Sequence, residues 1–360
     1  MIFLIYWGKF PAACGGVVHL TLFSVFLSKL HSMNFIPSYI KFLQSGELKV
    51  RAENAYNNLL SCTSCPRDCN VDRLNGKYGI CVSGHLPVVS SYTPHFGEEP
   101  VLSGSKGAGN IFFGNCNLKC IYCQNFEISQ NPKSEKLNEV SHNRLAEIMI
   151  ELQNKNCHNI GLVSPTHFSA TILKSIYIAA QQGLNLPIVY NTNGYDSVEM
   201  LKLYDGVVDI YLPDFKYGNS EYAKKYSLVG NYFEKTKQAL KEMFRQVDDK
   251  LVYDGDVVVR GLIIRHLILP NDLSETEKVF KFIAEELSTN VHISLMSQYY
   301  PTNKAYKDIL IDRLLRNSEY EKAIQLLEKY DLHNGWIQEM ESAQTYRPNF
   351  NEDRANPFKN

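Results

Sequence analysis

Apolar residues in the last two thirds of the chain come in short runs that alternate with amphipathic stretches. The runs are nearly continuous, which is typical of strands that are covered on both faces. Six runs are predicted to be strands: residues 110–114, 159–164, 187–191, 207–213, 258–269 and 291–296. Strands that alternate with helices indicate a parallel sheet with helical crossovers, and therefore an α/β fold.

The stretches between these runs show helical spacing. One apolar stripe recurs at i, i+3, i+4 and i+7 and consists of Leu145, Ile148, Met149 and Leu152. A similar stripe at 279–287 follows Ser274 and Glu277, whose spacing predicts a capping box. A curved partial barrel and an open doubly wound sheet share this pattern, and both bind ligands at the carboxyl ends of their strands.

The chain divides into four predicted parts: an N-terminal extension at 1–32, a Cys-rich region at 33–105, an α/β core at 106–300, and a C-terminal helix with a polar tail at 301–360. Within the second part, residues 34–60 are expected to be helical. Residues 62–109 are rich in Cys, Gly, Pro and Ser, which predicts an irregular segment organised by metal. The tail beyond Gln344 is polar, and we expect it to be mobile.

The extension at 1–32 differs in texture from the rest. Residues 10–28 lack Asp, Glu, Lys and Arg, and a bilayer is crossed by ~20 apolar residues. Pro11 and His19 weaken this reading, and the charged start of a secretory signal is missing. Met33 opens a normal soluble sequence, so we expect 1–32 to lie outside the working enzyme. A membrane anchor or targeting segment is the alternative.

The composition of the 360 residues is that of a globular protein, with 44% hydrophobic and 21% charged residues. It excludes a fibrous chain, a disordered chain and a polytopic membrane protein. Lys and Arg total 37 and Asp and Glu total 38, for a net charge of −1. Nucleic-acid binders usually carry a basic excess, so this balance argues against nucleic acid as a partner.

Nine cysteines are the unusual feature, and seven of them lie between 62 and 123 in two tight groups. Cys14 and Cys157 lie apart and fit buried free thiols. A disulfide framework is not expected, because the chain is large and its last two thirds resemble a cytosolic enzyme. We therefore expect a cytoplasmic protein. The short gaps within each group predict thiolates that converge on a metal or iron–sulfur centre.

The second group follows the first predicted strand as Cys116-x3-Cys120-x2-Cys123, with Tyr122 before the last cysteine. Three thiolates can hold a cuboidal four-iron cluster and leave one iron without a protein ligand. By analogy with zinc sites, an open position separates a catalytic centre from a closed one.

This loop resembles the S-adenosylmethionine (SAM) loop of radical SAM enzymes. The chain further looks like the PflX-type branch, relatives of the activating enzymes of pyruvate formate-lyase and other glycyl-radical enzymes. The likeness covers residues 37–332 and rests on these segments: CPRDC, HFGEEPVLSGSKGAGNIFFGNCNLKCIYCQNFEIS, SPTHF, YNTNGYDSVE, DIYLPDFKYGN, GLIIRHLILP and SLMSQYYP. The resemblance implies a partial six-stranded parallel β/α barrel.

The resemblance also implies a mechanism. SAM would chelate the open iron of a [4Fe–4S] cluster on Cys116, Cys120 and Cys123, and a reduced cluster would cleave SAM to a 5′-deoxyadenosyl radical. That radical would abstract hydrogen from a substrate, either a glycyl residue of a partner enzyme or another unactivated C–H bond. Flavodoxin or ferredoxin is the expected electron donor. The competing hypothesis is a non-catalytic iron–sulfur or zinc protein for electron transfer or interaction.

Two strand-end segments of the relatives hold SAM, and both differ here. Ser164, Thr166 and His167 occupy the place of a Gly-Gly-Glu segment that meets the SAM amine, so that His167 replaces an acid. Asn191 and Asn193 occupy the place of an Asp-Thr-Asn-Gly segment whose Asp helps to bind a monovalent cation. Asn191 carries no charge, which leaves that cation open.

Other positions match SAM contacts more closely. Asp214 would balance the sulfonium, Lys216 would contact the carboxylate or ribose, and Arg265 would bond the SAM carboxylate. Gln298 and Tyr299, together with Tyr122, complete the expected cofactor contacts. Simpler roles compete: a turn for Asp214, an internal ion pair for Arg265, core packing for Tyr299, and a satisfied core position for the nearby His266.

The first cysteine group supplies four thiolates, enough for one closed site. Its members are Cys62, Cys65, Cys69 and Cys81. Either zinc or an auxiliary iron–sulfur cluster fits this number. Some glycyl-radical activators carry an inserted ferredoxin-like domain with extra clusters, but this group precedes the barrel, so that architecture does not transfer.

Overall fold

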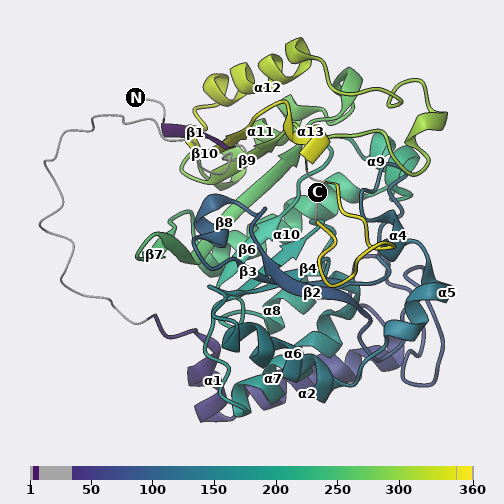
Figure 1. The fold of residues 1–360 in the computed structure, drawn as a ribbon, viewed down its shortest axis with the longest axis vertical. Coiled ribbons are helices and arrows are strands. Elements are labelled where there is room, and N and C mark those ends of the chain that lie inside the picture. Colours follow the sequence, from purple (N-terminus) through teal and green to yellow (C-terminus); the bar gives the residue numbers. More distant parts are fainter. Residues whose placement is uncertain (1–2, 8–34, 346, 359–360) are drawn as a thin grey trace, which may run out of the picture.

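The computed structural model describes residues 3–7, 35–345 and 347–358, and one mostly parallel sheet runs through the middle of them (Figure 1). The strands are β1 Phe3–Trp7, β2 Val89–His95, β3 Ala108–Phe113, β4 Ile160–Val163, β5 Ile188–Thr192, β6 Ile210–Pro213, β7 Val252–Asp254, β8 Val257–Leu267, β9 His292–Met296 and β10 Asn334–Gln338. Their order is β1-β10-β9-β8-β6-β5-β4-β3-β2, with β7 paired to β8.

The six predicted strands are all present and lie side by side as β3-β4-β5-β6-β8-β9, each parallel to the next. The α/β class is therefore confirmed. The sheet is larger than the six strands predicted, because β10 and β1 extend one edge in parallel and β2 adds an antiparallel strand at the other. The described strands form an open path whose ends do not pair with each other.

The N-terminal strand belongs to the segment that sequence analysis set aside. The backbone of Phe3–Trp7 pairs in parallel with β10, from Phe3 opposite Asn334 to Trp7 opposite Gln338. Residues 8–32 of the predicted extension lie outside the described residues. Among the helices that the structure describes, none is long and apolar enough to cross a membrane.

Helices cover the sheet (Figure 1), with α1, α2, α6 and α7 gathered on one side and α11 and α12 near β9 and β10. The helices are α1 Tyr39–Ser45, α2 Glu47–Asn57, α3 Pro100–Ser103, α4 Phe126–Ser129, α5 Pro132–Glu135, α6 His142–Asn154, α7 Ser169–Gln181, α8 Val198–Leu203, α9 Ser220–Ser227, α10 Tyr232–Val247, α11 Thr276–Phe282, α12 Asn317–Lys329 and α13 Ser342–Thr345. The helical prediction for 34–60 is confirmed by α1 and α2.

Helix α6 forms as its sequence predicts. The hydroxyl of Ser141 caps it by accepting a hydrogen bond from the backbone N–H of Arg144 at 3.0 Å. The predicted stripe is buried throughout: Leu145, Ile148, Met149 and Leu152. This face packs against α7 and the sheet, and so it belongs to the main hydrophobic core.

The predicted capping box before α11 is wrong. The helix begins at Thr276, and the hydroxyl of Ser274 instead accepts from the backbone of Leu269 at 2.8 Å and donates to the carbonyl of Leu267 at 2.9 Å. Glu277 pairs with Lys329 of α12. Ser274 therefore closes the turn after β8, because that turn offers its hydroxyl nearer partners than the helix does.

The segment 62–109 is irregular only in part: residues 62–87 contain no helix or strand, but β2, α3 and the start of β3 lie in the remainder. The prediction of a mobile tail is wrong for the described residues. Phe350 is fully buried and packs on Phe112 of β3, with 5.6 Å between the ring centroids. Arg354 pairs with the buried carboxylate of Glu135 at 2.8 Å. Phe358 also packs on Phe112, with 5.6 Å between the ring centroids, so two aromatic side chains and one ion pair hold a segment whose composition is otherwise polar.

Candidate active site

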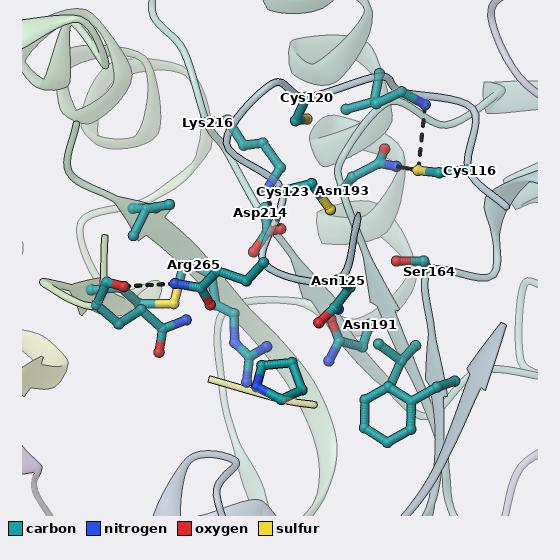
Figure 2. Close-up of a pocket in the computed structure, with 18 of the residues that line it drawn as sticks. Cys116, Cys120, Cys123, Asn125, Ser164, Asn191, Asn193, Asp214, Lys216 and Arg265 are labelled. Carbon is teal, nitrogen blue, oxygen red and sulfur yellow. Dashed lines mark hydrogen bonds and ion pairs between the residues drawn. The ribbon is translucent and has the colours of Figure 1, made fainter. Parts of the chain in front are cut away.

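A cavity of about 220 Å³ opens at the carboxyl ends of the parallel strands (Figure 2). Most of its polar lining comes from the ends of the parallel strands and the loops that follow them. These side chains include Cys116, Cys120, Cys123, Gln124, Asn125, Ser164, Asn191, Asn193, Asp214, Lys216, Arg265 and Gln298, and His95 and Glu98 add to them from the segment before β3. Parallel strands end at one edge of a sheet, so residues far apart in sequence converge there.

The loop after β3 carries three thiols into this cavity. The backbone leaves the strand through Asn115, which has a left-handed φ of 64°. The loop is then fixed by backbone hydrogen bonds to the end of α9, from Lys119 N to Ser227 O at 3.1 Å and from Ile121 N to Tyr226 O at 2.9 Å. The positions of the cysteines are therefore set by α9 as well as by β3.

Each of the three sulfur atoms has a polar partner. The pairs are Asn193 Nδ2 with Cys116 Sγ at 3.6 Å, Ser227 Oγ with Cys120 Sγ at 3.0 Å, and Ser129 Oγ with Cys123 Sγ at 3.2 Å. Burial raises the pKa of all three thiols, to about 12 for Cys120. Metal ligation must displace their protons, and groups that can donate to sulfur stabilise the thiolates that result. The residues therefore fit a cluster held by three cysteines.

Asp214 and Lys216 form an ion pair at the end of β6, with 2.5 Å between Oδ2 and Nζ. Burial alone disfavours the charge on Lys216, but the negative charge of Asp214 and its hydrogen bond to the ammonium outweigh burial and raise the pKa of Lys216. The hydroxyl of Tyr232 accepts from the backbone N–H of Lys216 at 3.0 Å and lies 2.9 Å from the carbonyl of Asp214. The cavity thus keeps one carboxylate and one ammonium in fixed positions.

A hydrogen bond between two side-chain amides joins the loop after β5 to the cysteine loop. Asn193 donates from Nδ2 to Oδ1 of Asn117 at 2.8 Å, beside Cys116. Gly194 follows with a φ of +77°, and a Cβ there would lie 2.3 Å from the carbonyl oxygen of Asp214. Only glycine allows this approach, which brings the loops after β5 and β6 together.

Arg265 faces two acidic residues that sequence analysis left without a role. Its guanidinium binds Glu99 in bidentate fashion, at 2.7 Å from Nε and 2.6 Å from Nη2, and also contacts Glu98. Glu98 lines the cavity too, and its carboxylate accepts from Asn110 Nδ2 at 2.7 Å. Arg265 therefore lines the cavity, as its predicted contact with SAM requires. It also forms the internal ion pair that was the simpler alternative to that contact. The sequence signal that could have revealed this pairing is the presence of two adjacent acidic residues directly before Pro100.

Comparison with known proteins agrees with this geometry. The model of the Radical SAM superfamily matches residues 110–269. An uncharacterized protein of Methanocaldococcus jannaschii is 35% identical over 321 residues, which cover 85% of this chain and 86% of that protein. The chain belongs to the radical SAM superfamily. A second uncharacterized protein of the same organism is 28% identical over 189 residues, 48% of this chain and 54% of its own length.

Two solved structures show weak similarity to the chain. A radical SAM methyltransferase from Sphaerobacter thermophilus is 11% identical with a TM-score of 0.42, over 63% of this chain and 65% of that one. Methylornithine synthase is 13% identical with a TM-score of 0.40, over 83% and 80% of the two chains. For this radical SAM protein, membership implies a [4Fe–4S] cluster and SAM, and the three-thiol cavity is where both would bind.

Two predicted SAM contacts of this radical SAM protein, Thr166 and His167, do not line the cavity. The short turn Thr166–Phe168 after β4 directs both side chains inward. The hydroxyl of Thr166 lies 3.0 Å from that of Thr192, and Nε2 of His167 lies 2.8 Å from the carbonyl oxygen of Gly114. Burial lowers the pKa of His167 to about 3, so the ring is neutral. Only Ser164 of this segment reaches the cavity.

The residues after β9 divide in the same way. Gln298 lines the cavity, and its backbone oxygen accepts from Gln124 Nε2 at 2.7 Å. Tyr299 does not line it, because its buried hydroxyl donates to the carbonyl of Ile311 at 2.5 Å. Tyr299 instead packs edge-on against Tyr122, which does line the cavity, at 5.8 Å between centroids. The prediction for Tyr299 is therefore wrong and its packing alternative holds.

His266 occupies the core position that was its simpler alternative. It is fully buried, with Nδ1 2.5 Å from the carbonyl oxygen of Phe215 and Nε2 3.1 Å from the hydroxyl of Thr276.

The C-terminal tail covers part of the cavity mouth. Pro348 and Phe358 belong to the lining, and the ring of Phe358 lies 4.3 Å from that of His95 between centroids. In Figure 1 the tail, in yellow, runs past α4, where Glu127 accepts a hydrogen bond from the backbone of Phe350 at 2.8 Å.

The first cysteine group converges as well, in a separate enclosed cavity behind the SAM loop. The residues that line it include Cys62, Cys65, Cys69 and Cys81, together with His167, which had been predicted to contact SAM. The two cavities are linked through Arg67, whose Nε donates to the carbonyl oxygen of Asn117 at 3.0 Å.

Proposed function

We propose that this radical SAM protein abstracts hydrogen from an unactivated C–H bond, in the manner of the PflX-type relatives of glycyl-radical activating enzymes. When bound, the reduced [4Fe–4S] cluster supplies one electron to SAM, which divides into methionine and a 5′-deoxyadenosyl radical. The observation that carries the proposal is the convergence of three free thiols with fixed carboxylate, ammonium and amide groups in one cavity.

The chain's own residues would bind and orient the cofactors. Cys116, Cys120 and Cys123 would hold the cluster. The Asp214–Lys216 pair offers opposite charges to the sulfonium and the carboxylate of SAM, and its low exposure strengthens both interactions. The amides of Asn191 and Asn193, from the end of β5, can donate to a carboxylate or accept from an amine.

The proposed substrate is a C–H bond presented by an extended polypeptide, such as a glycyl residue of a partner protein. Support comes from the tail, because residues 347–358 of this chain already lie across the mouth. An opening that accommodates one polypeptide segment suits another of similar width. Substrate entry would then require the tail to move, and the moved tail would no longer shield the cavity from water.

The proposed electron donor is flavodoxin or ferredoxin. Lys304 binds the SAM loop through its backbone N–H, which donates to the carbonyl of Ile121 at 2.8 Å. Lys304 and Lys307 are exposed nearby, whereas Lys225, whose side chain is 50% exposed, pairs with Asp308 at 2.8 Å. The two exposed lysines beside the cluster suit an acidic donor. The proposed compartment is the cytoplasm, in keeping with the free thiols at eight described cysteines.

The test is anaerobic incubation of the cluster-loaded protein with SAM and dithionite, followed by assay for 5′-deoxyadenosine. Formation of this product is expected. Its absence from fully loaded protein would instead favour the competing function, a non-catalytic iron–sulfur or zinc protein. A glycyl-radical partner with deuterated glycine tests the substrate class, because deuterium should pass into 5′-deoxyadenosine. SAM cleavage without that transfer would overturn the glycyl assignment alone.

A further inference from the structure

The four cysteines outside the SAM loop line one enclosed cavity. Cys62 and Cys65 are 8% exposed and Cys81 is 9% exposed, while Cys69 is partly buried. All four are free thiols. They come from 20 residues of irregular chain at 62–81, so that neither a helix nor a strand brings them together. Four converging thiols without a disulfide are the ligand set of a closed metal site.

The backbone around these thiols adopts unfavourable conformations. Asp68, Asn70 and Val82 have left-handed φ values of 43°, 52° and 54°, and this region is especially unfavourable for a β-branched valine. Gly79 lies so close to Cys69 that a Cβ would sit 2.7 Å from its Sγ. Backbone hydrogen bonds hold part of this shape, among them Cys62 N to Val71 O and Asn70 N to Cys62 O, each at 3.0 Å. Binding of a ligand to all four sulfurs would offset the remaining cost.

A buried positive charge faces the four thiols. Arg73 is 1% exposed, and its guanidinium donates from Nε to the carbonyl oxygen of Gly84 at 3.0 Å and from Nη1 to that of His167 at 2.7 Å. Nη1 also lies 3.6 Å from Cys62 Sγ. These described partners are neutral carbonyl groups and a sulfur atom. A buried guanidinium needs a negative partner, and a Cys62 thiolate would supply one.

A second cation and a histidine line the same cavity. Within the described residues, Nη2 of Arg67 and Nδ1 of His167 are both buried and have no hydrogen-bond partner. Four thiolates around Zn²⁺, or around a [4Fe–4S]²⁺ core, carry a net charge of −2. Two guanidinium groups balance that charge, and the vacant Nη2 of Arg67 can donate to sulfur. Nδ1 of His167 carries no proton, because Nε2 of this neutral ring donates to the carbonyl oxygen of Gly114.

We propose that Cys62, Cys65, Cys69 and Cys81 hold a second metal centre of this radical SAM protein, closed by four thiolates. Four thiols lose four protons when the metal binds, and the metal's positive charge replaces them. No group of three or more Cys, His, Asp or Glu side chains in the described part of the chain is arranged for a single ion, and the SAM-loop cysteines are no exception. Zinc, whose bonds to sulfur are about 2.3 Å, and an iron–sulfur cluster both accept four thiolates, and metal analysis distinguishes them.

The centre would also support the active site from behind. Arg67 lies between Cys65 and Cys69 in the sequence, and its guanidinium binds the backbone of Asn117 in the SAM loop. Pro66 accepts a hydrogen bond from the hydroxyl of Tyr195 at 3.1 Å, next to the β5 loop that reaches the cavity. Metal at the four thiols would therefore hold Arg67 and Pro66 against two loops of the cofactor site.

The experiment measures iron, sulfide and zinc in anaerobically purified full-length protein. We expect about eight irons per chain, or about four irons with one zinc, and the two results identify the second metal. About four irons without zinc would overturn the proposal.

The variant C116A/C120A/C123A tests the second centre alone. It should keep about four irons or one zinc and lose SAM cleavage, whereas a metal-free but folded variant would contradict the proposal. The variant C65A/C81A should lose the second metal and keep the SAM-loop cluster. The control C157A, which removes a buried thiol outside both groups, should keep both metal centres. Since metal content is the readout, failure here is distinct from failure of SAM cleavage.

Discussion

Arg265 on β8 binds Glu99 through two parallel hydrogen bonds, from Nε at 2.7 Å and from Nη2 at 2.6 Å, across 166 residues of sequence. The Glu99 side chain is fully buried and that of Arg265 is 12% exposed. Glu98 contacts the same guanidinium, so that one cation serves two carboxylates. This arrangement joins the segment between β2 and β3 to strand β8.

Replacing Arg265 by methionine should therefore destabilise the protein strongly. The change leaves two carboxylates without their cation, and breaking a buried pair in this way costs about 3–5 kcal/mol. Urea unfolding measures the loss. Arg245→Met is the matched control, because its side chain is 55% exposed and surface pairs contribute about 0–1 kcal/mol. Equal losses in the two variants would contradict the importance of the buried pair.

Replacing Cys120 by alanine should abolish the SAM-loop cluster and reduce SAM cleavage to background. Two remaining thiolates cannot hold three of the four irons. Iron content and 5′-deoxyadenosine formation are the measurements. Cys157→Ala is the control, since Cys157 is 3% exposed and lines neither thiol cavity. Retained cleavage in the Cys120 variant would show that this cysteine is not a ligand.

Replacing Phe350 by alanine should release the C-terminal tail. A fully buried phenylalanine contributes about 3–5 kcal/mol, and Phe350 is one of the two tail residues whose rings pack on Phe112 of β3. Limited proteolysis should cut the 347–358 segment ~10-fold faster or more, because each 1.4 kcal/mol changes a population tenfold. Ala355→Ser, at an exposed position of the same tail, is the control. Unchanged proteolysis would mean that other contacts hold the tail.

Asp196 should make stability depend on pH. Burial raises its pKa from 3.8 to about 6, although Thr192 Oγ1 donates to its carboxylate at 2.5 Å and Tyr190 at 3.2 Å. The folded protein therefore holds this proton more tightly than the unfolded chain does. Stability from this group should fall as pH rises from about 4 to about 6, by ~3 kcal/mol in total.

The variant Asp196→Asn tests this dependence, because the amide carries no titrating proton and the hydroxyl partners can reorient toward it. Urea unfolding of both proteins at several pH values between 4 and 6 should show a steeper decline in the parent. Parallel curves would mean that other groups produce the slope.

The elements that could be predicted are those whose signal is local. Strands β3 to β9 on the parallel path are apolar runs, and the α6 stripe needs only 3.6-residue spacing, so both follow from neighbouring residues. Strand β10 was missed because Asn334-Gly335 opens it with weak strand formers, and Gly335 has a φ of +127°. Only its place beside β9 makes this segment a strand.

The candidate site shows the same division. Cysteine spacing alone identified both thiol groups, because ligands of one centre must be close in the chain or be brought close by it. The direction of a side chain is different. His167 and Ser164 are three residues apart, yet one faces the first cysteine group and the other the SAM cavity, since the turn after β4 reverses between them.

The sequence by itself determined an α/β chain with a three-thiol loop after its first parallel strand, because hydrophobic periodicity and short ligand spacing are both encoded over a few residues. The radical SAM family came from the resemblance of that loop and of the strand-end segments to known enzymes. The tertiary structure decided that Arg265 forms ion pairs with Glu98 and Glu99. It also decided that Arg67 and Arg73 line the cavity of the four thiols, and that Phe350 and Phe358 hold the tail over the mouth of the SAM cavity. Those pairings depend on which surfaces meet after folding, and no local pattern specifies them.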